Sequence, residues 1–316
     1  MNYTHKLSIA VLSWNTRRLT KNCLTSIKKN VKGVDYEVIL IDNNSRDGSD
    51  EMVEENFPWV KLIKNESNEG FAKGNNQAFE AAGGKYFLLL NSDTEISVGS
   101  IENMVAFLDK KQEFGAVTGR LMNLDQTTQY YMHRRFPNYF SLVMALIHKK
   151  ARFFKPQIVK DYLYLDKDFK KNFEVEQAAA ACLMLRSDLV SRINGLLDEK
   201  NFPIYYNDVD LCYRLRQIGS KIACLAIAPI THIKGQSIKK LDFSKGMQEY
   251  VASSLRFFSK FDLRFDYWML KFTYMFVFSG VLIFSLAQLI LKRIKLTEIR
   301  RRWEILKQAT IVQSIT

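Results

Sequence analysis

The first 120 residues alternate short apolar runs, rich in β-branched and aromatic residues, with stretches of helical periodicity. Parallel strands need a long crossover connection, which is usually a helix, so this alternation predicts a mostly parallel sheet flanked by helices. The predicted helices lie around residues 19–27 and 52–53 and over 71–82. The predicted strands cover residues 7–13, 37–42, 60–64, 86–91 and 116–121.

A polar cluster directly follows three of these strands. The clusters are SWNT at 13–16, DNNSRDGS at 42–49 and NSD at 91–93. In open α/β sheets, ligands bind beyond the carboxyl ends of the strands. We therefore expect the three loops to converge on one site.

The chain beyond residue 121 is less regular. We predict one catalytic domain over 1–240, with halves at about 1–121 and 122–240, followed by a helical, membrane-associating region over 241–316. The periodicity of the later segments predicts a small-residue strand at 178–185, a helix at 208–218, a strand at 221–227 and an amphipathic helix at 245–261.

Residues 272–291 contain no charged side chain. As a helix they would be about 30 Å long, the thickness of the hydrocarbon core of a bilayer. Their few polar side chains form no strong polar face, which favours a membrane span or burial in a protein interface over a helix lying flat. A buried core helix, or a helix packed in a homo-oligomer, is the alternative.

The net charge of +13 is concentrated in two segments. Residues 134–171 carry ten Lys/Arg against three Asp, and residues 292–307 carry seven Lys/Arg against two Glu. The second segment directly follows the apolar run, which favours an anionic membrane surface as a partner. Zinc-finger spacing, an RRM-type motif and a bZIP basic region are missing from the sequence, so nucleic acid is not expected.

The four cysteines are scattered without CxxC or zinc-finger spacing. This pattern predicts neither a structural zinc site nor a disulfide framework, and it fits a reducing, cytosol-facing compartment. The amino terminus has too short an apolar run for a signal peptide, so we expect no cleaved leader.

Asp42 closes an apolar strand, where its carboxylate can accept hydrogen bonds from a ligand. Asp47, in the same loop, is better explained as a turn or capping residue. The segment NEGFAKGNN at 68–76 places glycines, amides and Lys73 on a loop that opens a helix, a setting that suits phosphate. An ordinary loop and helix start explains that segment equally well.

Asn91 and Asp93 follow a buried strand with one residue between them, so their side chains point the same way. Amide and carboxylate oxygens suit Mg²⁺ or Mn²⁺ shared with a diphosphate. A helix cap at Asp93 is the alternative. His232 follows a strand, near Gly235 and Ser237, and could also bind a metal ion.

The densest cluster of candidate residues is IYYNDVDLCYRLRQIG, in which tyrosines lead into Asp208 and Asp210 before a helix. Acidic residues are favoured at a helix start by the helix dipole, so capping could explain either one alone. Two carboxylates directly after Tyr205 and Tyr206 are more than capping requires.

These motifs together resemble family 2 glycosyltransferases of the GT-A type, in the rhamnosyltransferase-like branch. The resemblance covers about residues 7–262, and its specificity comes from the order and spacing of the motifs. It implies a GT-A nucleotide-sugar fold, α/β with a mostly parallel central sheet, to which amphipathic and apolar C-terminal helices are added. The motifs are VLSWN, LIDNNSRDGS, NEGFAKGNNQA, LLLNSDT, AAACLMLRSDL, NDVDLCYRLRQIG and HIKGQS.

The resemblance also implies a role for each matching residue. Asp208 corresponds to the catalytic base, Asp93 to the last aspartate of the Asp-x-Asp metal motif, and His232 to the histidine that completes the metal site. Asp210 and Tyr206 are expected on the acceptor side or in support of the loop. The residues expected to bind the donor are Ser13, Asn15, Asp42, Lys73, Gly74, Asn75, Asn91, Ser92 and Asp93.

Two positions depart from the family pattern. Asn91 replaces the first aspartate of the metal motif, so metal binding depends more on Asp93, and Asn207 replaces the glutamate before the base. The expected cofactor remains Mg²⁺ or Mn²⁺.

The implied activity is inverting transfer from a nucleoside diphosphate sugar, dTDP-rhamnose or a UDP-hexose, to a glycan or a polyprenyl-diphosphate-linked saccharide. The expected place is the cytoplasmic face of the cell membrane, in cell-surface polysaccharide synthesis. A non-catalytic, membrane-associated nucleotide-sugar or glycan binding protein of the same fold is the alternative. A nucleotidyltransferase would need a glycine in the amino-terminal SWNTRRLTKN loop, which has none.

The expected topology contains a conflict. Nucleotide sugars are cytosolic, so a single span at 272–291 would place the basic tail on the other side of the membrane, against the positive-inside rule. Interfacial or re-entrant seating, or packing in an oligomer, would remove the conflict.

Overall fold

The computed structural model describes residues 3–150, 155–233, 242–291 and 294–312. The expected motif HIKGQS therefore lies outside the described residues from Lys234 onward, which includes Gly235 and Ser237. The described strands are β1 (His5–Ser13), β2 (Tyr36–Asp42), β3 (Lys61–Lys64), β4 (Gly84–Asn91), β5 (Thr94–Ile96), β6 (Phe114–Met122), β7 (Phe173–Glu174), β8 (Cys182–Arg186) and β9 (Lys221–His232).

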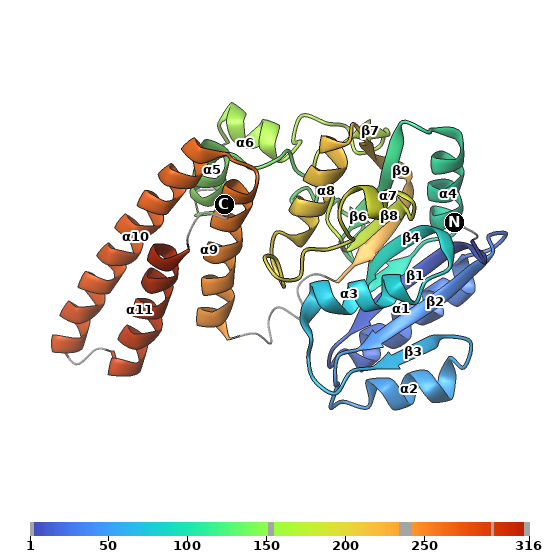
Figure 1. The fold of residues 1–316 in the computed structure, drawn as a ribbon, viewed down its shortest axis with the longest axis horizontal. Coiled ribbons are helices and arrows are strands. Elements are labelled where there is room, and N and C mark those ends of the chain that lie inside the picture. The colour runs from blue at the N-terminus through green and yellow to red at the C-terminus, as the bar shows by residue number, and fades with distance from the viewer. Residues whose placement is uncertain (1–2, 151–154, 234–241, 292–293, 313–316) are drawn as a thin grey trace.

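Helices flank the sheet and form a separate layer at its side (Figure 1). The described helices are α1 (Arg17–Asn30), α2 (Ser49–Asn56), α3 (Gly70–Glu80), α4 (Ser100–Lys110), α5 (Tyr139–Lys150), α6 (Gln157–Tyr162), α7 (Leu189–Arg192), α8 (Asn207–Gln217), α9 (Phe243–Lys260), α10 (Arg264–Ile290) and α11 (Leu296–Ile311).

The described strands form one sheet in the order β3-β2-β1-β4-β8-β6-β9-β5, and β7 pairs with β9. The pairs β3-β2, β2-β1, β1-β4 and β6-β9 are parallel, whereas β8 is antiparallel to both β4 and β6. The expected mostly parallel α/β sheet is therefore confirmed, with β8, β5 and β7 as its antiparallel members.

The strand expected at 178–185 is shorter than predicted and begins at Cys182. Its first part instead forms a turn, in which the N–H of Cys182 donates to the carbonyl of Ala179 at 3.4 Å. The strand expected at 221–227 is longer than predicted, because β9 resumes pairing with β6 after an irregularity between Leu225 and Pro229. Gly119 makes the irregularity possible, since a Cβ there would lie 2.2 Å from the carbonyl oxygen of Ala228.

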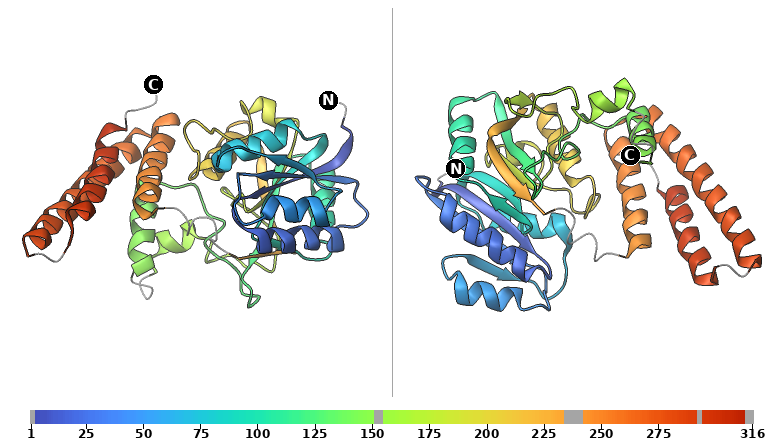
Figure 2. Two further views of the ribbon diagram at one scale, coloured as in Figure 1. Left: turned by 90° about the horizontal axis from the view of Figure 1, so that it is seen from below. Right: turned by 180° about the vertical axis from the view of Figure 1, so that it is seen from behind.

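The sheet has a hydrophobic core on each face. One core packs α1, α2 and α4 against the sheet through residues such as Leu24, Met52 and Met104. The other packs α3, α7 and α8 through residues such as Ala78 and Leu211. Figure 2 shows the helices on both sides of the sheet.

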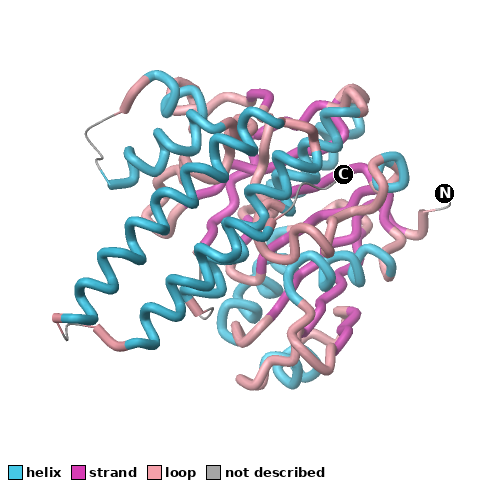
Figure 3. Tube along the Cα trace, turned by 60° about the vertical axis from the view of Figure 1, so that its left-hand side comes forward, coloured by secondary structure: helices cyan, strands magenta, loops and turns pink. Residues whose placement is uncertain are grey.

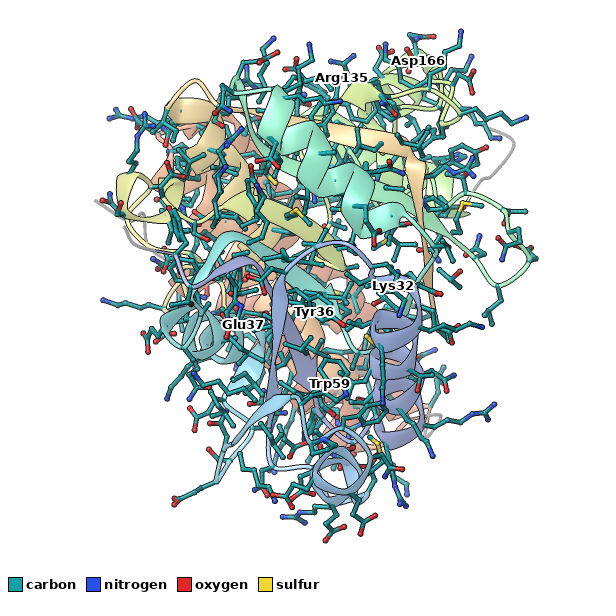
Figure 4. The ribbon with its side chains drawn as sticks, turned by 90° about the vertical axis from the view of Figure 1, so that its right-hand side faces the viewer. Lys32, Tyr36, Glu37, Trp59, Arg135 and Asp166 are labelled. Atoms are coloured by element: carbon teal, nitrogen blue, oxygen red, sulfur yellow. The ribbon has the colours of Figure 1, made fainter. Side chains whose placement is uncertain are left out.

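Aromatic packing covers the sheet near β3. Trp59 lies just before β3, and its ring meets Tyr36 edge-on with 6.3 Å between the centroids. Figure 4 shows Trp59 close to Tyr36 in this part of the molecule.

A third hydrophobic core joins α5, α6 and α8 to the helical layer formed by α9, α10 and α11. An ion pair also connects this layer to the sheet domain: the ammonium of Lys260, in α9, lies 2.6 Å from the carboxylate of Asp210, in α8. Figure 3 shows α10 and α11 lying side by side. Among the described residues, α10 is the one helix long and apolar enough to cross a membrane.

Candidate active site

A pocket of about 840 Å³ opens beyond the carboxyl ends of β1, β2 and β4. Each loop after these strands contributes to its wall, so the three polar clusters do converge as predicted. Small side chains at 179–181 line part of the pocket and leave room for a ligand. Other lining residues are Trp14, Asn43, Asn68, Gly70, Asn91, Ser92, Asp93, Arg134, Tyr162, Tyr205, Tyr206, Asn207, Asp208, His232 and Tyr250.

Asp93 and His232 lie together in this pocket. The short strand β5 begins directly after Asp93 and pairs with the end of β9, with Thr94 opposite His232. The imidazole Nε2 of His232 is 3.3 Å from Oδ1 of Asp93, and both side chains are buried.

Gln129 fixes the orientation of the His232 ring. Its Nε2 donates to the carbonyls of His232 at 2.8 Å and Met122 at 3.3 Å, which leaves its Oε1 to accept from Nδ1 of His232 at 3.0 Å. Because an amide oxygen can only accept, this contact places a proton on Nδ1, and Nε2 is the ring nitrogen that faces Asp93.

A carboxylate oxygen and a lone-pair nitrogen that face each other suit a cation between them. Two ligands at right angles, each about 2.1 Å from a metal ion, are about 3 Å apart, which is close to the observed separation. No cluster of three or more His, Cys, Asp or Glu side chains occurs in the described residues. A divalent ion held by Asp93 and His232 would have to take its remaining ligands from water and substrate phosphates.

Asp208 also lines the pocket, in the first turn of α8. Gln177 connects it to Arg134: Nε2 of Gln177 donates to Oδ2 of Asp208 at 3.1 Å, and its Oε1 accepts from Nε of Arg134 at 2.9 Å. Burial raises the pKa of Asp208, although the positive charge of Arg134 acts in the opposite direction. A carboxylate with a raised pKa is well suited to take up a proton from a ligand.

Tyr206 sets the entry of the chain into α8. Its backbone is left-handed, with φ of 64°, which is uncommon for a residue other than glycine and is typical of functional sites. Its buried ring packs against Tyr250 and Phe257, with centroids 5.9 Å and 5.7 Å away. This packing holds the residue that precedes Asn207 and Asp208 in the pocket wall.

Asp42 is not one of the residues that line the pocket, although the next residue, Asn43, is, and Asp42 carries an unpaired buried oxygen. Only 2% of the residue is exposed, and its Oδ2 accepts from the N–H of Ser45 at 2.8 Å. Its Oδ1 has no hydrogen-bond partner in the described residues. Burial raises the pKa of Asp42, as expected for a carboxylate that awaits a donor from a ligand.

Ser13 and Asn15 organise the loops instead of lining the pocket. The Ser13 hydroxyl is 3.1 Å from that of Thr20, in a buried hydroxyl group that also contains Thr16 and Ser92. Asn15 joins two loops, because its N–H donates to Ser45 at 2.8 Å and its Oδ1 accepts from the N–H of Arg46 at 2.7 Å.

The residues at 73–75, which the resemblance assigns to donor binding, are not among those that line the pocket. Lys73 pairs with Glu69 at 2.5 Å, and the amide of Asn75 donates to the carbonyl of Phe71 at 2.9 Å. A Cβ at Gly74 would lie 2.5 Å from Cδ1 of Leu12, so this glycine lets α3 pack against β1. The earlier part of the same loop, with Asn68 and Gly70, lines the pocket instead.

Asp210 is buried away from the pocket. Its carboxylate contacts Nε of Arg214 at 2.7 Å and Nζ of Lys260 at 2.6 Å. Arg214 in turn donates to the carbonyls of Ile193, Gly195 and Leu196, which holds the loop before α8. The sequence left two roles open for Asp210, contact with the acceptor and support of the loop, and this position fits support of the loop.

Sequence reasoning missed Gln129, Gln177 and Arg134. The two glutamines act through long-range contacts, 103 and 31 residues away from His232 and Asp208, which no local motif reveals. The sequence did draw attention to Arg134, because this residue begins the basic segment 134–171. Its place in a charged segment does not show whether it lines a pocket or lies on the surface.

Residues 8–189 match the family model described as "Glycosyl transferase family 2". An N-acetylglucosaminyl-diphospho-decaprenol L-rhamnosyltransferase of Mycobacterium tuberculosis is 26% identical over 63% of this chain and 67% of its own length. A low-salt glycan biosynthesis hexosyltransferase, Agl10 of Haloferax volcanii, is 23% identical over 79% of this chain and 74% of its own.

Solved structures show the same fold. GalNAc-T7, crystallised with UDP, GalNAc and Mn²⁺, has a TM-score of 0.55 and 16% identity over 72% of this chain. TarS 1-349 of S. aureus, in complex with UDP-GlcNAc, has a TM-score of 0.51 and 17% identity over 79% of this chain. This chain spans 44% of the GalNAc-T7 chain and 66% of the TarS chain.

We predict that Asp42→Asn raises stability at neutral pH. Burial raises the pKa of Asp42, so the folded state holds this proton more tightly than the unfolded state does. The folded state therefore loses stability as the pH rises from the ordinary value through the raised pKa. A neutral amide removes this penalty and should raise the free energy of unfolding by about 1 kcal/mol. Urea unfolding measures the gain, which should shrink as the pH falls toward the ordinary value of 3.8.

Asp166→Asn is the matched control, because Asp166 is exposed and should change stability by less than about 0.5 kcal/mol. A loss of stability in Asp42→Asn would mean that the carboxylate is satisfied in the folded protein.

Proposed function

This chain belongs to glycosyl transferase family 2 and is a glycosyltransferase, and from this premise we propose that it transfers a hexose with inversion from a nucleoside diphosphate sugar. The observation that carries the proposal is the arrangement of one pocket. Asp93 and His232 lie at the carboxyl edge of the sheet, and Asp208, whose pKa is raised, lines the same pocket from α8.

Asp208 is proposed as the general base. Its carboxylate removes the proton from an acceptor hydroxyl while the hydroxyl oxygen forms a bond to the anomeric carbon of the donor sugar. The bond from that carbon to the diphosphate breaks at the same time, and its electron pair leaves with the nucleoside diphosphate. Attack from the face opposite the leaving group inverts the anomeric centre.

Asp93 and His232 are proposed to hold Mg²⁺ or Mn²⁺. A divalent ion there would neutralise the charge that develops on the departing diphosphate. The Gln129 contact supports this role, because it keeps the Nε2 lone pair of His232 aimed at the site. No second carboxylic acid is then needed to protonate the leaving group, unlike in glycosidases.

The donor nucleoside is proposed to lie between the loops after β1 and β2. The unpaired Oδ1 of buried Asp42 would accept a hydrogen bond from the base or ribose, with Trp14 and Asn43 in the adjoining pocket wall. dTDP-rhamnose is supported by the rhamnosyltransferase among the relatives, and a UDP-sugar by the structures of TarS and GalNAc-T7.

The acceptor is proposed to be a lipid-linked saccharide, in the synthesis of cell-surface glycan. The name of the mycobacterial relative, which acts on a diphospho-decaprenol, supports a diphosphate-containing acceptor. Arg134 lines the pocket, and among the described residues only its Nε makes a side-chain hydrogen bond, so its terminal nitrogens could meet an anion. Tyr205, Tyr206 and Tyr250 offer aromatic faces for sugar rings. Such an acceptor places the enzyme at the cytoplasmic face of the membrane.

Asp208→Asn should abolish transfer and leave donor binding intact. The amide cannot accept the proton of the acceptor, so turnover should fall by about 10²–10⁴-fold, whereas the contact with Gln177 can be kept. Turnover is measured as release of nucleoside diphosphate, and donor binding by calorimetry. A variant with near-native turnover would rule out Asp208 as the base.

Asp93→Ala should weaken metal-dependent donor binding by roughly 10–100-fold or more. A thermal-shift series with UDP, dTDP, GDP and CMP sugars, with and without Mn²⁺, identifies the donor in the native protein, because a ligand that binds the folded state raises Tm. Asp93→Ala should lose the Mn²⁺-dependent part of the shift. Absence of any shift in the native protein would favour a non-catalytic glycan-binding role.

Arg134→Gln should move the acid limb of the kcat profile to higher pH. The guanidinium favours the ionised form of Asp208, so its removal raises the pKa of Asp208 further, and the base is lost by protonation at a higher pH. Arg135→Gln is the matched control, because Arg135 pairs with Glu176 at 3.3 Å at the end of the molecule away from Trp59 (Figure 4). An unchanged acid limb in Arg134→Gln would contradict the coupling.

A further inference from the structure

The outward face of α10 is a long apolar surface. Its most exposed side chains include Phe276, Ile290 and Ile283, with exposed fractions of 83%, 80% and 68%. Tyr267, Leu270 and other residues of the opposite face pack into the third hydrophobic core. The helix is therefore apolar both where it packs and where it faces outward.

Seven of the exposed side chains of α10 form a stripe. At 100° per residue these seven fall within an arc of about 80°, and the stripe is about 37 Å long. Val277, Val281 and Phe284 are exposed as well and widen the apolar surface beside the stripe in the second half of the helix. A continuous apolar stripe of this length on a water-facing helix marks an interaction surface. Its members are Phe265, Trp268, Phe272, Phe276, Ile283, Leu286 and Ile290.

Helix α5 extends this surface. The ring of Phe140 lies 6.2 Å from that of Phe265, and the hydroxyl of Tyr139 is 3.0 Å from that of Thr273. Leu146 and Ile147 of α5 are exposed as well. The stripe of α10 and the exposed side chains of α5 together are called the apolar seat below.

Helix α11 returns along α10 and brings charges with it. The carbonyl of Val312, just after α11, accepts from the hydroxyl of Tyr267 at 2.8 Å and from Nζ of Lys271 at 2.9 Å, near the start of α10. Arg302 contacts the hydroxyl of Ser285, near the end of α10. The whole of α11 therefore lies beside the uncharged part of α10 (Figure 3).

This pairing conflicts with a membrane-spanning α10. A bilayer crossed by α10 would also have to enclose α11, on which Arg300, Arg301, Glu304 and Lys307 are exposed. Charged side chains in the hydrocarbon core are costly unless they face a protein interior or water. The length and apolarity of α10 alone would have allowed a span.

We propose that the apolar seat and α11 place this enzyme on one leaflet of an anionic bilayer without crossing it. The apolar stripe lies among the upper acyl chains, and the outward side chains of α11 lie at the headgroups. Trp303, Leu296 and Ile311 are exposed on α11 beside Arg300 and Lys307, a mixture typical of interfacial helices. The proposal deepens the membrane association contained in the proposed function.

Charge favours lipid over a second copy of the chain as the occupant of the seat. Residues 294–312 carry five Lys/Arg against two Glu, so two copies that meet through this side would bring like charges together. An anionic leaflet is attracted by the same charges. In this arrangement α10 does not cross the bilayer, so the basic residues of α11 stay on the cytoplasmic side with the catalytic domain. The conflict between a spanning helix and the positive-inside rule is then removed.

The seat is joined to the side of the pocket where Asp208 lies. Pro137 and Tyr162 line the pocket and lie next to or within the segments that form α5 and α6, and Tyr250 lines it from α9. These helices share the third hydrophobic core with α10. The helices that pack against the seat thus also form part of the pocket wall.

Flotation with preformed vesicles tests binding. The full chain should float with vesicles of phosphatidylcholine mixed with phosphatidylglycerol, float less with phosphatidylcholine alone, and be released by high salt with alkaline carbonate. A chain that stays at the bottom of the gradient with both vesicle types would overturn the proposal. Because no donor or turnover is involved, that failure would leave the proposed chemistry untouched.

Cysteine labelling separates a seat from a span. Lys295, exposed between α10 and α11, is changed to cysteine, and the four native cysteines are buried. On vesicles, a membrane-impermeant maleimide should label Lys295→Cys equally with and without detergent. If α10 crosses the bilayer, this position reaches the lumen and is labelled only after detergent, which would overturn the proposal.

Two double variants test the stripe itself. Phe276→Glu with Ile283→Glu should weaken vesicle binding by roughly tenfold or more, because it places charges in the acyl region. Val98→Glu with Leu124→Glu is the matched control, since those side chains are 80% and 67% exposed but lie outside the helical layer. Equal vesicle binding by the two double variants would overturn the proposal. So would a native chain that is dimeric without lipid and that the first double variant converts to a monomer, because a second copy would then occupy the stripe.

Discussion

Parallel pairing in one register is the constraint on which the rest of the site depends. β1 pairs with β2 so that Ser13 lies opposite Asp42, and with β4 so that Leu12 lies opposite Asn91. Because parallel strands end at the same edge, this register delivers three polar loops to one place. The apolar cores on the two faces hold the register, since a slip by one residue would move the side chains of the strand to the opposite face of the sheet.

The second half of the chain completes the site through contacts that span long sequence distances. The irregularity opposite Gly119 lets β9 continue to His232, which then pairs beside Asp93 through β5. Asp208 joins the pocket on α8, and the buried contact between Asp210 and Lys260 connects that helix to α9. The part of the pocket wall that contains Asp208 is thus connected to the helical layer that contains the apolar seat.

Two buried carboxylates are not fully satisfied by the folded chain. Asp42 keeps an unpaired oxygen and Asp208 a raised pKa, and both arrangements cost stability in the folded protein. Asp210 is buried as well, but two cations satisfy it. Asp210 therefore has the contacts of a structural carboxylate, whereas the ligand roles proposed for Asp42 and Asp208 agree with their incomplete satisfaction.

The sequence by itself determined the α/β sheet, its principal strands and the loops of Asp42, Asp93 and Asp208, because hydrophobic periodicity and strand ends are local properties. It could not show that Asn68 and Gly70 line the pocket whereas Lys73, Gly74 and Asn75 do not, because helix orientation depends on contacts with other elements. Residues 272–291 had the length and apolarity of a span, but whether they cross a membrane depends on what packs beside them. Only the tertiary structure placed the charged α11 there, and only long-range folding brought Gln129 to His232 and Gln177 to Asp208.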